Sequence, residues 1–250
     1  MLLRVEDFRD FSLSATDDDF GAVDDVYFDS TGRWRVRYIV GDTRRWFFGG
    51  KVLISPELIT RLEITEQLVD LDATKDQVKD SPKPETDQPI SRQYEATLLD
   101  HYGLQHYWTV SPATPAGVPH FPYAGPIAPV SGTPSPDDVA GSRLDEENYH
   151  LQSSKDLTSY SVYANDEKMG SISDILFDST TWQVRFIEIE SDGIMERDRY
   201  VLPVQVFKDF DPLESRAHVP VALQVIEDAP KSETLTDDDE KELNAYYGIK

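Results

Sequence analysis

Two runs of aspartate are the residues in this chain best suited to hold a metal ion. Asp17-Asp18-Asp19 and Asp237-Asp238-Asp239 carry the hard oxygen ligands that calcium prefers. Neither run has the alternating acidic spacing, the central glycine and the closing glutamate of a calcium-binding loop. The first is typical of a turn between strands and the second of the start of a helix. We therefore predict no metal site and no cofactor.

The histidines and serines do not form a recognisable catalytic set. No two of the five histidines stand three or four residues apart, the spacing that presents a metal-binding pair on one face of a helix. The sequence has no Gly-x-Ser-x-Gly nucleophile motif, and its glycines do not compose a phosphate-binding loop. The absence of cysteine excludes thiolate nucleophiles. We predict a protein that is not an enzyme, with a small-molecule or metal-binding enzyme in a cleft between domains as an open alternative.

An acid and an arginine recur together in two predicted hairpins. Asp25 with Arg37, and Asp174 with Arg185, face each other across the strands if short loops join them. Such a pair could form a charged ligand site or a proton site. The simpler interpretation is a cross-strand salt bridge that fixes the register and contributes a few tenths to about one kcal/mol. We predict structural pairs.

These hairpins belong to an internal duplication. The segment FGAVDDVYFDS at residues 20–30 returns as MGSISDILFDS at residues 169–179. Each copy consists of short β-branched and aromatic runs separated by turn residues, which indicates a small barrel or sandwich. Each copy then ends in a predicted helix, with Ser91 or Thr236 as the N-cap and a Tyr-Gly pair at the C-terminus.

The predicted hairpins also assign core residues. Side chains alternate between the two faces of a strand, so residues that face each other across a hairpin share one face of the sheet. Eight apolar residues are predicted on that face, lining the cores of the two copies: Val26, Phe28, Trp34, Val36, Ile175, Phe177, Trp182 and Val184.

Proline divides the chain. Eight of the sixteen prolines lie within residues 105–150, the composition of an extended linker. We therefore predict a first domain at residues 1–104, a linker at 105–150 and a second domain at 151–250. Phe121 and Tyr123 depart from the polar composition of a free tether, and we expect them to pack onto a barrel.

An aromatic run is the best candidate for an interaction surface. Trp46, Phe47 and Phe48 are consecutive, so they cannot all point inward along a strand. The second copy has no aromatic residue in this region, so the run is not part of the shared barrel. We predict that these three residues, together with Phe121 and Tyr123, form the interaction surface. Burial under the linker or the other barrel is the alternative.

Charge and hydropathy limit the partners. The chain has 47 acidic and 24 basic residues and a net charge of -23, which repels phosphate backbones. Direct binding to nucleic acid is therefore not expected. No stretch of about 18 apolar residues occurs, so no transmembrane segment is predicted. With no cysteine, this favours a cytoplasmic protein. We expect an unidentified protein partner and leave open a homo-oligomer and peripheral membrane association.

Three strand motifs occur in the same order in both copies. They are Gly-x-Val/Ile-x-Asp-Val/Ile-x-Phe-Asp at residues 21–29 and 170–178, Trp-x-Val-Arg-Tyr/Phe-Ile at 34–39 and 182–187, and Val-Leu-Ile/Pro at 52–54 and 201–203. Each copy resembles the PRC-barrel domain, the small β-barrel of the photosynthetic reaction-centre H subunit's cytoplasmic part and of a ribosome maturation factor. The second copy is the closer to the reaction-centre version.

The resemblance implies a fold and a kind of function. The fold is mainly β: two tandem PRC-type small β-barrels, each closed by a short C-terminal helix, joined by the proline-rich linker. The implied function is a non-enzymatic adaptor or scaffold that binds another protein, or itself, through its barrel faces. A peripheral membrane-associated or electron-transport assembly factor, similar to the soluble part of the H subunit, is the alternative.

Overall fold

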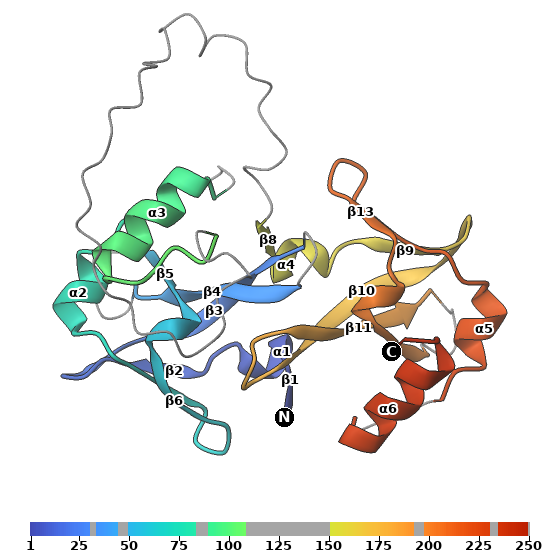
Figure 1. Ribbon diagram of the computed structural model, residues 1–250, viewed down its shortest axis with the longest axis horizontal. Coiled ribbons are helices and arrows are strands. Elements are labelled where there is room, and N and C mark those ends of the chain that lie inside the picture. The colour runs from blue at the N-terminus through green and yellow to red at the C-terminus, as the bar shows by residue number, and fades with distance from the viewer. Residues whose placement is uncertain are drawn as a thin grey trace, which may run out of the picture.

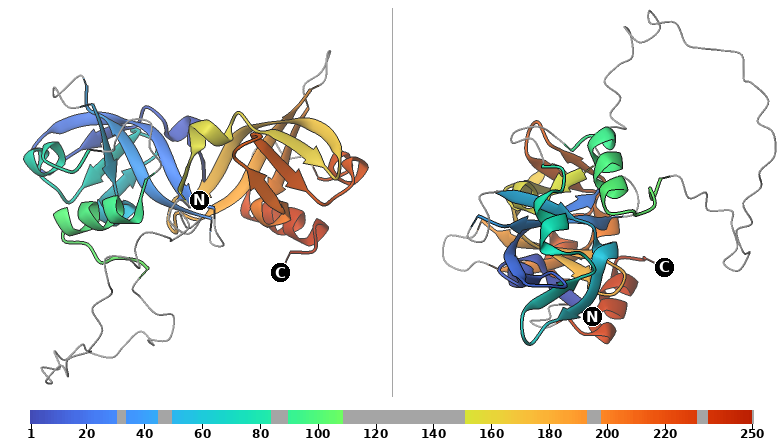
Figure 2. Two further views of the ribbon diagram at one scale, coloured as in Figure 1. Left: turned by 90° about the horizontal axis from the view of Figure 1, so that it is seen from above. Right: turned by 90° about the vertical axis from the view of Figure 1, so that its left-hand side faces the viewer.

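The computed structural model describes residues 1–30, 34–44, 50–83, 90–108, 151–192, 198–230 and 235–249 (Figure 1). It contains two β-sheets of seven strands each, which confirms the predicted fold class of a mainly β protein with two barrel-like units. Figure 2 shows the two units side by side, with the N-terminus between them and the C-terminus on the second unit.

The two halves contain the same elements in the same order. The first half comprises β1 (Leu2–Arg4), α1 (Val5–Phe8), β2 (Ser12–Ser14), β3 (Asp19–Asp29), β4 (Arg35–Asp42), β5 (Lys51–Ile54), the 3₁₀ turn η1 (Pro56–Leu58), β6 (Ile59–Glu63), β7 (Leu68–Leu71), α2 (Lys75–Lys79) and α3 (Arg92–His101). The second comprises β8 (Leu151–Ser153), α4 (Ser154–Leu157), β9 (Ser161–Ala164), β10 (Glu167–Asp178), β11 (Val184–Ser191), β12 (Arg199–Pro203), the 3₁₀ turn η4 (Val204–Val206), β13 (Asp209–Asp211), β14 (Arg216–Val219), α5 (Leu223–Glu227) and α6 (Asp237–Tyr246). The duplication therefore extends over each half, beyond the hairpin that revealed it.

Each sheet contains one strand from the other half of the chain. The first sheet has the order β5-β4-β3-β2-β7-β6 and the second the order β12-β11-β10-β9-β14-β13. Strand β1, from the first half, pairs with β10 of the second sheet, and β8, from the second half, pairs with β3 of the first. Neither sheet is therefore built from one half of the chain alone, because the first strand of each half pairs with the sheet of the other half (Figure 2).

The register of both hairpins differs from the prediction. Phe28 lies opposite Val36 and Phe177 opposite Val184, so the loops are longer than the short turns we expected. Trp34 and Trp182 belong to the turns, where each adopts a positive φ, of 47° and 61° respectively. The amide of Trp182 donates to the carbonyl of Asp178 at 2.7 Å, closing that turn.

The predicted core residues are buried, but they form one core instead of two. Seven of the eight are buried and Trp34 packs against them. A single hydrophobic cluster includes Val26 and Phe28 of the first half together with Ile175 and Phe177 of the second. Side chains that reach from one half into the other join the two cores: Leu3 and Phe8 of the first half lie in the same cluster as Phe177 of the second.

The C-terminal helices agree with the prediction. Ser91 caps α3 by accepting from the Tyr94 amide, and Thr236 caps α6 in a reciprocal capping box with Asp239. Gly103 and Gly248 follow the helices with φ of 68° and 70°, the left-handed conformation expected of a C-terminal glycine. Leu98 packs α3 against the first sheet, and Leu243 packs α6 against the second.

The glycines shared by the two copies have a packing role that can be tested. A Cβ atom at Gly170 would lie 2.0 Å from the backbone carbonyl oxygen of Glu190, and one at Gly21 would lie 2.7 Å from that of Asp42. Gly170→Ala should therefore lower the free energy of unfolding by roughly 2 kcal/mol or more, because β10 and β11 must separate to admit the methyl group. Chemical denaturation measures this. Ser171→Ala, at the next position of the strand, is the control and should change stability by less; equal stability of Gly170→Ala and the parent would contradict the assignment.

Candidate interaction site at the junction of the two barrels

The junction is built from three backbone ladders. Strand β1 pairs antiparallel with the end of β10, placing Leu3 opposite Phe177. Strand β8 pairs in the same way with the end of β3, placing Gln152 opposite Phe28. Between them the two hairpin turns meet, where the Val36 amide donates to the Trp182 carbonyl at 2.7 Å and the Val184 amide donates to the Trp34 carbonyl at 2.6 Å.

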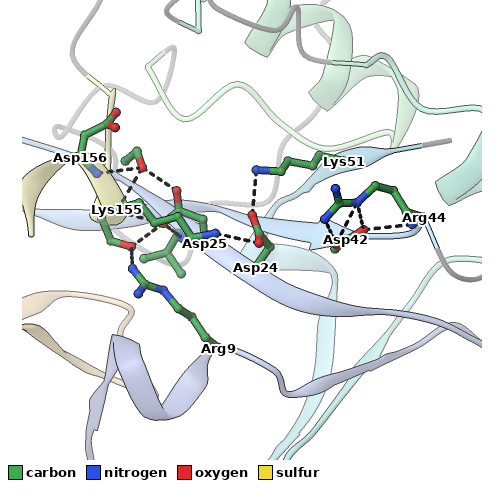
Figure 3. Close-up of polar contacts among 11 residues, drawn as sticks. Arg9, Asp24, Asp25, Asp42, Arg44, Lys51, Lys155 and Asp156 are labelled. Carbon is green, nitrogen blue, oxygen red and sulfur yellow. Dashed lines mark hydrogen bonds and ion pairs between the residues drawn. The ribbon is translucent and has the colours of Figure 1, made fainter.

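The repeated aspartate of the first half binds the start of a helix from the second half. Asp25 accepts hydrogen bonds from the hydroxyls of Ser153 and Ser154, and its Oδ1 lies 3.3 Å from the Lys155 amide nitrogen (Figure 3). These donors lie at the first turn of α4, where amides lack partners within the helix. Asp25 is 5% exposed, so the hydroxyls and amides replace the water that the carboxylate loses on burial.

Asp174 occupies the equivalent position in the second half. Its Oδ1 accepts from the Glu6 amide, at the first turn of α1, at 3.2 Å. The duplicated aspartate therefore contacts the crossing helical turn of the other half in both units. The second unit also places a cation beside this aspartate. Arg4 of the first half lies 3.7 Å from Asp174 and forms an ion pair with Glu188. Glu188 stands opposite Asp174 on β11. In the first unit the residue opposite Asp25 is Val40.

The predicted pairs of Asp25 with Arg37 and of Asp174 with Arg185 are wrong. Asp25 and Asp174 stand opposite Val40 and Glu188, because the longer turns and a bulge in each hairpin shift the register. Arg37 forms an ion pair with Asp29 at 3.2 Å. Arg185 forms an ion pair with Glu240 of α6. The arginines thus hold structure within their own units, and the aspartates serve the junction.

Burial sets the protonation of Asp174. It raises the pKa of this carboxyl from 3.8 to about 6, against the lowering effects of the Ile175 and Glu6 amides and of Arg4; the charge of Glu188 raises it further. Arg199 of β12 also faces Glu188, at 3.7 Å, and Asp7 of α1 lies near Arg4. Two buried carboxylates therefore share the cation that β1 delivers.

Lysines surround the first crossing point. Asp24 binds Lys155 at 2.7 Å and Lys51 at 2.9 Å (Figure 3). Burial alone would raise the pKa of Asp24, but these two ammonium groups outweigh it and lower the pKa. Arg9 of the first half donates to the Ser154 hydroxyl at 3.2 Å. Ionic contacts therefore connect the halves at both crossing points.

Aromatic side chains fill the junction. Phe8 of α1 is fully buried, and its ring lies 5.5 Å from Phe177 and 6.0 Å from Trp182, edge to face. In the opposite direction, Trp34 lies 4.8 Å from Phe210 on β13. Each half therefore places a large ring against the other, an arrangement that buries apolar area and fixes orientation.

A second buried polar cluster lies under α3. Glu95 is fully buried and accepts from the hydroxyls of Tyr38 at 3.0 Å and Tyr107 at 2.7 Å, with Arg92 at 3.3 Å. Arg37 lies 3.8 Å over the Tyr107 ring. Burial, and then the charge of Glu95, raise the pKa of Tyr107, so the hydroxyl stays protonated and donates. The cluster fixes the segment after α3 to the first sheet.

The aspartate runs are occupied by contacts within the chain. Asp17 accepts from the Lys75 amide at 2.8 Å, and Asp18 binds the Lys75 ammonium at 2.6 Å. Asp238 binds Lys241, and Asp239 caps α6. Across the described residues, no group of three or more histidine or acidic side chains is arranged to hold a metal ion.

A shallow hollow of about 750 Å³ lies on the second unit. The turn between β9 and β10, the β13–β14 hairpin and the segment after β14 enclose it. Its lining residues include Asp166, Asp209, Phe210, Asp211, Leu213 and His218. Leu213, at the tip of the hairpin, is 95% exposed. The hollow thus combines an exposed apolar side chain with several acids.

The sequence-predicted surface residues Trp46, Phe47, Phe48, Phe121 and Tyr123 lie outside the described residues. The motifs in the sequence did not indicate the junction residues Arg4, Phe8, Ser153 and Ser154. A signal for them exists, because residues 2–8 and 151–157 stand at equivalent places before the two repeated hairpins. That signal marks them as part of each repeat, but it does not say which sheet each one joins.

Comparison with protein families identifies the second copy. Residues 152–222 match the PRC-barrel domain family, which confirms the resemblance for the second copy. The first half repeats its elements one by one. No curated protein matches the chain. A PRC-barrel domain supports a role as a protein-interaction module, and such domains are generally non-catalytic. Within the described part of the chain, no helix has the length and apolar character needed to cross a membrane.

Asp174 should make the stability of the protein depend on pH. Its raised pKa means that the folded state binds a proton more tightly than the unfolded state, so the free energy of unfolding should fall as pH rises from about 4 to about 6. The change attributable to this group is roughly 2 to 3 kcal/mol. Asp174→Asn should remove that part of the slope, because the amide still accepts from the Glu6 amide and does not titrate.

Urea denaturation of the parent and of Asp174→Asn at several pH values between 4 and 7 measures the difference. Asp76→Asn, at an exposed position of α2, is the control and should keep the slope of the parent. Parallel curves for the parent and Asp174→Asn would contradict the prediction.

Proposed function

We propose that this protein is a non-enzymatic adaptor that binds another protein through the surface of its barrels, at the hollow of the second unit. The observation that carries the proposal is the position of Leu213, which is 95% exposed beside a hollow of about 750 Å³. The whole lining of the hollow lies inside residues 152–222, the part that matches the PRC-barrel family. A concave surface lined by apolar side chains and a small number of polar groups is the usual form of a binding site.

The chemistry of the hollow favours a particular kind of partner. Phe210, Pro212 and Leu213 supply apolar surface, while Asp166, Asp209 and Asp211 supply negative charge that outnumbers the one lysine of the lining, Lys208. A partner segment with an apolar side chain flanked by lysine or arginine would complement both features. The net charge of -23 would also speed the approach of a basic partner.

The junction suits a role as an adaptor. The two units share one hydrophobic core and exchange two strands, β1 and β8, so a partner held by one unit keeps a fixed orientation relative to the other. Three buried carboxylates, Asp25, Asp174 and Glu95, all bind groups of this chain. Their contacts support a structural role for them.

Leu213→Asp should abolish partner binding without unfolding the protein, because the side chain is almost fully exposed. The test is purification of the tagged full chain from its native cell after cross-linking, with identification of the proteins joined to residues of the hollow. Thr65→Asp is the matched control, since Thr65 occupies the equivalent exposed position on the β6–β7 hairpin of the first unit.

The expected result is one protein, cross-linked to the hollow, that the parent and Thr65→Asp retain and Leu213→Asp loses at least about tenfold. Equal retention by Leu213→Asp, or cross-links confined to other surfaces, would contradict the assignment of the site.

A further inference from the structure

The two ends of the connection between the halves lie at the same place on the first unit. Trp108 precedes the connecting residues 109–150 and Leu151 follows them. Both pack in one hydrophobic cluster with Tyr38, Val40 and Leu98 of the first half. The two residues that flank the connection, Trp108 and Leu151, therefore both lie on the first unit. The geometry of the junction does not depend on the number of residues in the connection.

The contacts across the junction are those of a protein interior. Phe8 and Phe177, from different halves, are both fully buried and lie 5.5 Å apart. Backbone hydrogen bonds cross the junction in both exchanged strands and between the turns. Interfaces that resemble a core cut in two are those of obligate complexes, whose chains stay associated without a covalent connection.

The polar contacts distinguish the correct pairing from the alternatives. Arg4 of the first half and Ser153 of the second occupy equivalent positions on the crossing strands, but they meet different surroundings. Arg4 meets the two buried carboxylates of Asp174 and Glu188. Ser153 meets Asp25 alone, since Val40 takes the place of Glu188.

An exchange between two second halves would therefore be unfavourable. It would place Ser153 beside Asp174 and Glu188, with no cation from the crossing strand for two buried acids. Removing the partner of a buried charge is strongly destabilising, because the remaining charge loses its solvation without compensation. The cationic strand β1 is the matching partner for the second unit.

We propose that the junction is a self-sufficient binding interface: each half of this chain binds the other in trans, and the contact of Arg4 with Asp174 and Glu188 selects a first half as the partner of the second unit. The partner that this surface fits is thus the segment 2–8 of a first half of this chain. The proposal concerns the junction and is independent of the hollow on the second unit.

The test uses the full chain with a protease site introduced within residues 109–150. After the folded protein is cleaved, the two fragments should elute from a sizing column as one species with the mass of the uncleaved chain at micromolar concentration. They should also unfold in one transition. Separate elution of the fragments, or a species with any other stoichiometry, would overturn the proposal.

The selection by charge is tested in the same cleavable chain. Arg4→Ser should raise the dissociation constant of the cleaved halves by about tenfold or more, because it leaves the two acids without their shared cation. Adding Glu188→Val gives the second crossing point the serine and valine of the first, and it should restore most of the lost affinity. Arg61→Ser, which removes the surface ion pairs of this β6 residue with Glu66 and Asp70, is the control and should leave the constant unchanged.

Rescue distinguishes selection by charge from a merely structural role for Arg4. If Arg4→Ser does not fold, the double variant Arg4→Ser with Glu188→Val should still fold and still give a complex. A double variant that binds no more tightly than Arg4→Ser would overturn the assignment of Arg4 as the selecting residue.

Discussion

The structure depends on the exchange of one strand and one helical turn between the two halves. Asp25 and Asp174 accept from amides and hydroxyls at the first turn of the crossing segment, so each half completes the hydrogen bonding of the other. A carboxylate that is 5% or 3% exposed needs such donors, and its own sheet does not supply enough of them. The merged core and the fixed arrangement of the two units follow from this exchange.

The two crossing points solve the same physical problem with different chemistry. At the first, serine hydroxyls bind the single buried acid Asp25, and the neighbouring Asp24 binds Lys155 of the other half. At the second, an arginine is shared by two buried acids that face each other across β10 and β11. A duplication initially produces two identical crossing points. The later difference in their polar residues matches each crossing strand to one sheet. The difference lets a two-fold arrangement of similar halves distinguish one half from the other.

The candidate binding surface lies away from this junction. The hollow beside Leu213 is lined by the β13–β14 hairpin, the turn between β9 and β10 and the segment after β14, all of the second half. Phe210 connects the two regions, because it lines the hollow and also contacts Trp34 of the first half. The junction thus supports one wall of the surface that we propose for a partner.

The sequence by itself determined the mainly β class, the duplication, the buried apolar residues and the helix caps. These follow from local rules: alternation along a strand, capping chemistry at Ser91 and Thr236, and the need for glycine at Gly103 and Gly248. It also marked Asp25 and Asp174 as requirements of the repeat, although it assigned them the wrong partners.

Only the tertiary structure decided the register, the partners of those aspartates and the sheet that each first strand joins. The register depends on turns in which Trp34 and Trp182 adopt positive φ, a conformation that sequence patterns do not predict for tryptophan. The exchange depends on contacts between residues as far apart as Arg4 and Glu188. A strand that fits the edge of either of two similar sheets has the same local pattern in both cases, so the choice is made by the buried charges that it meets.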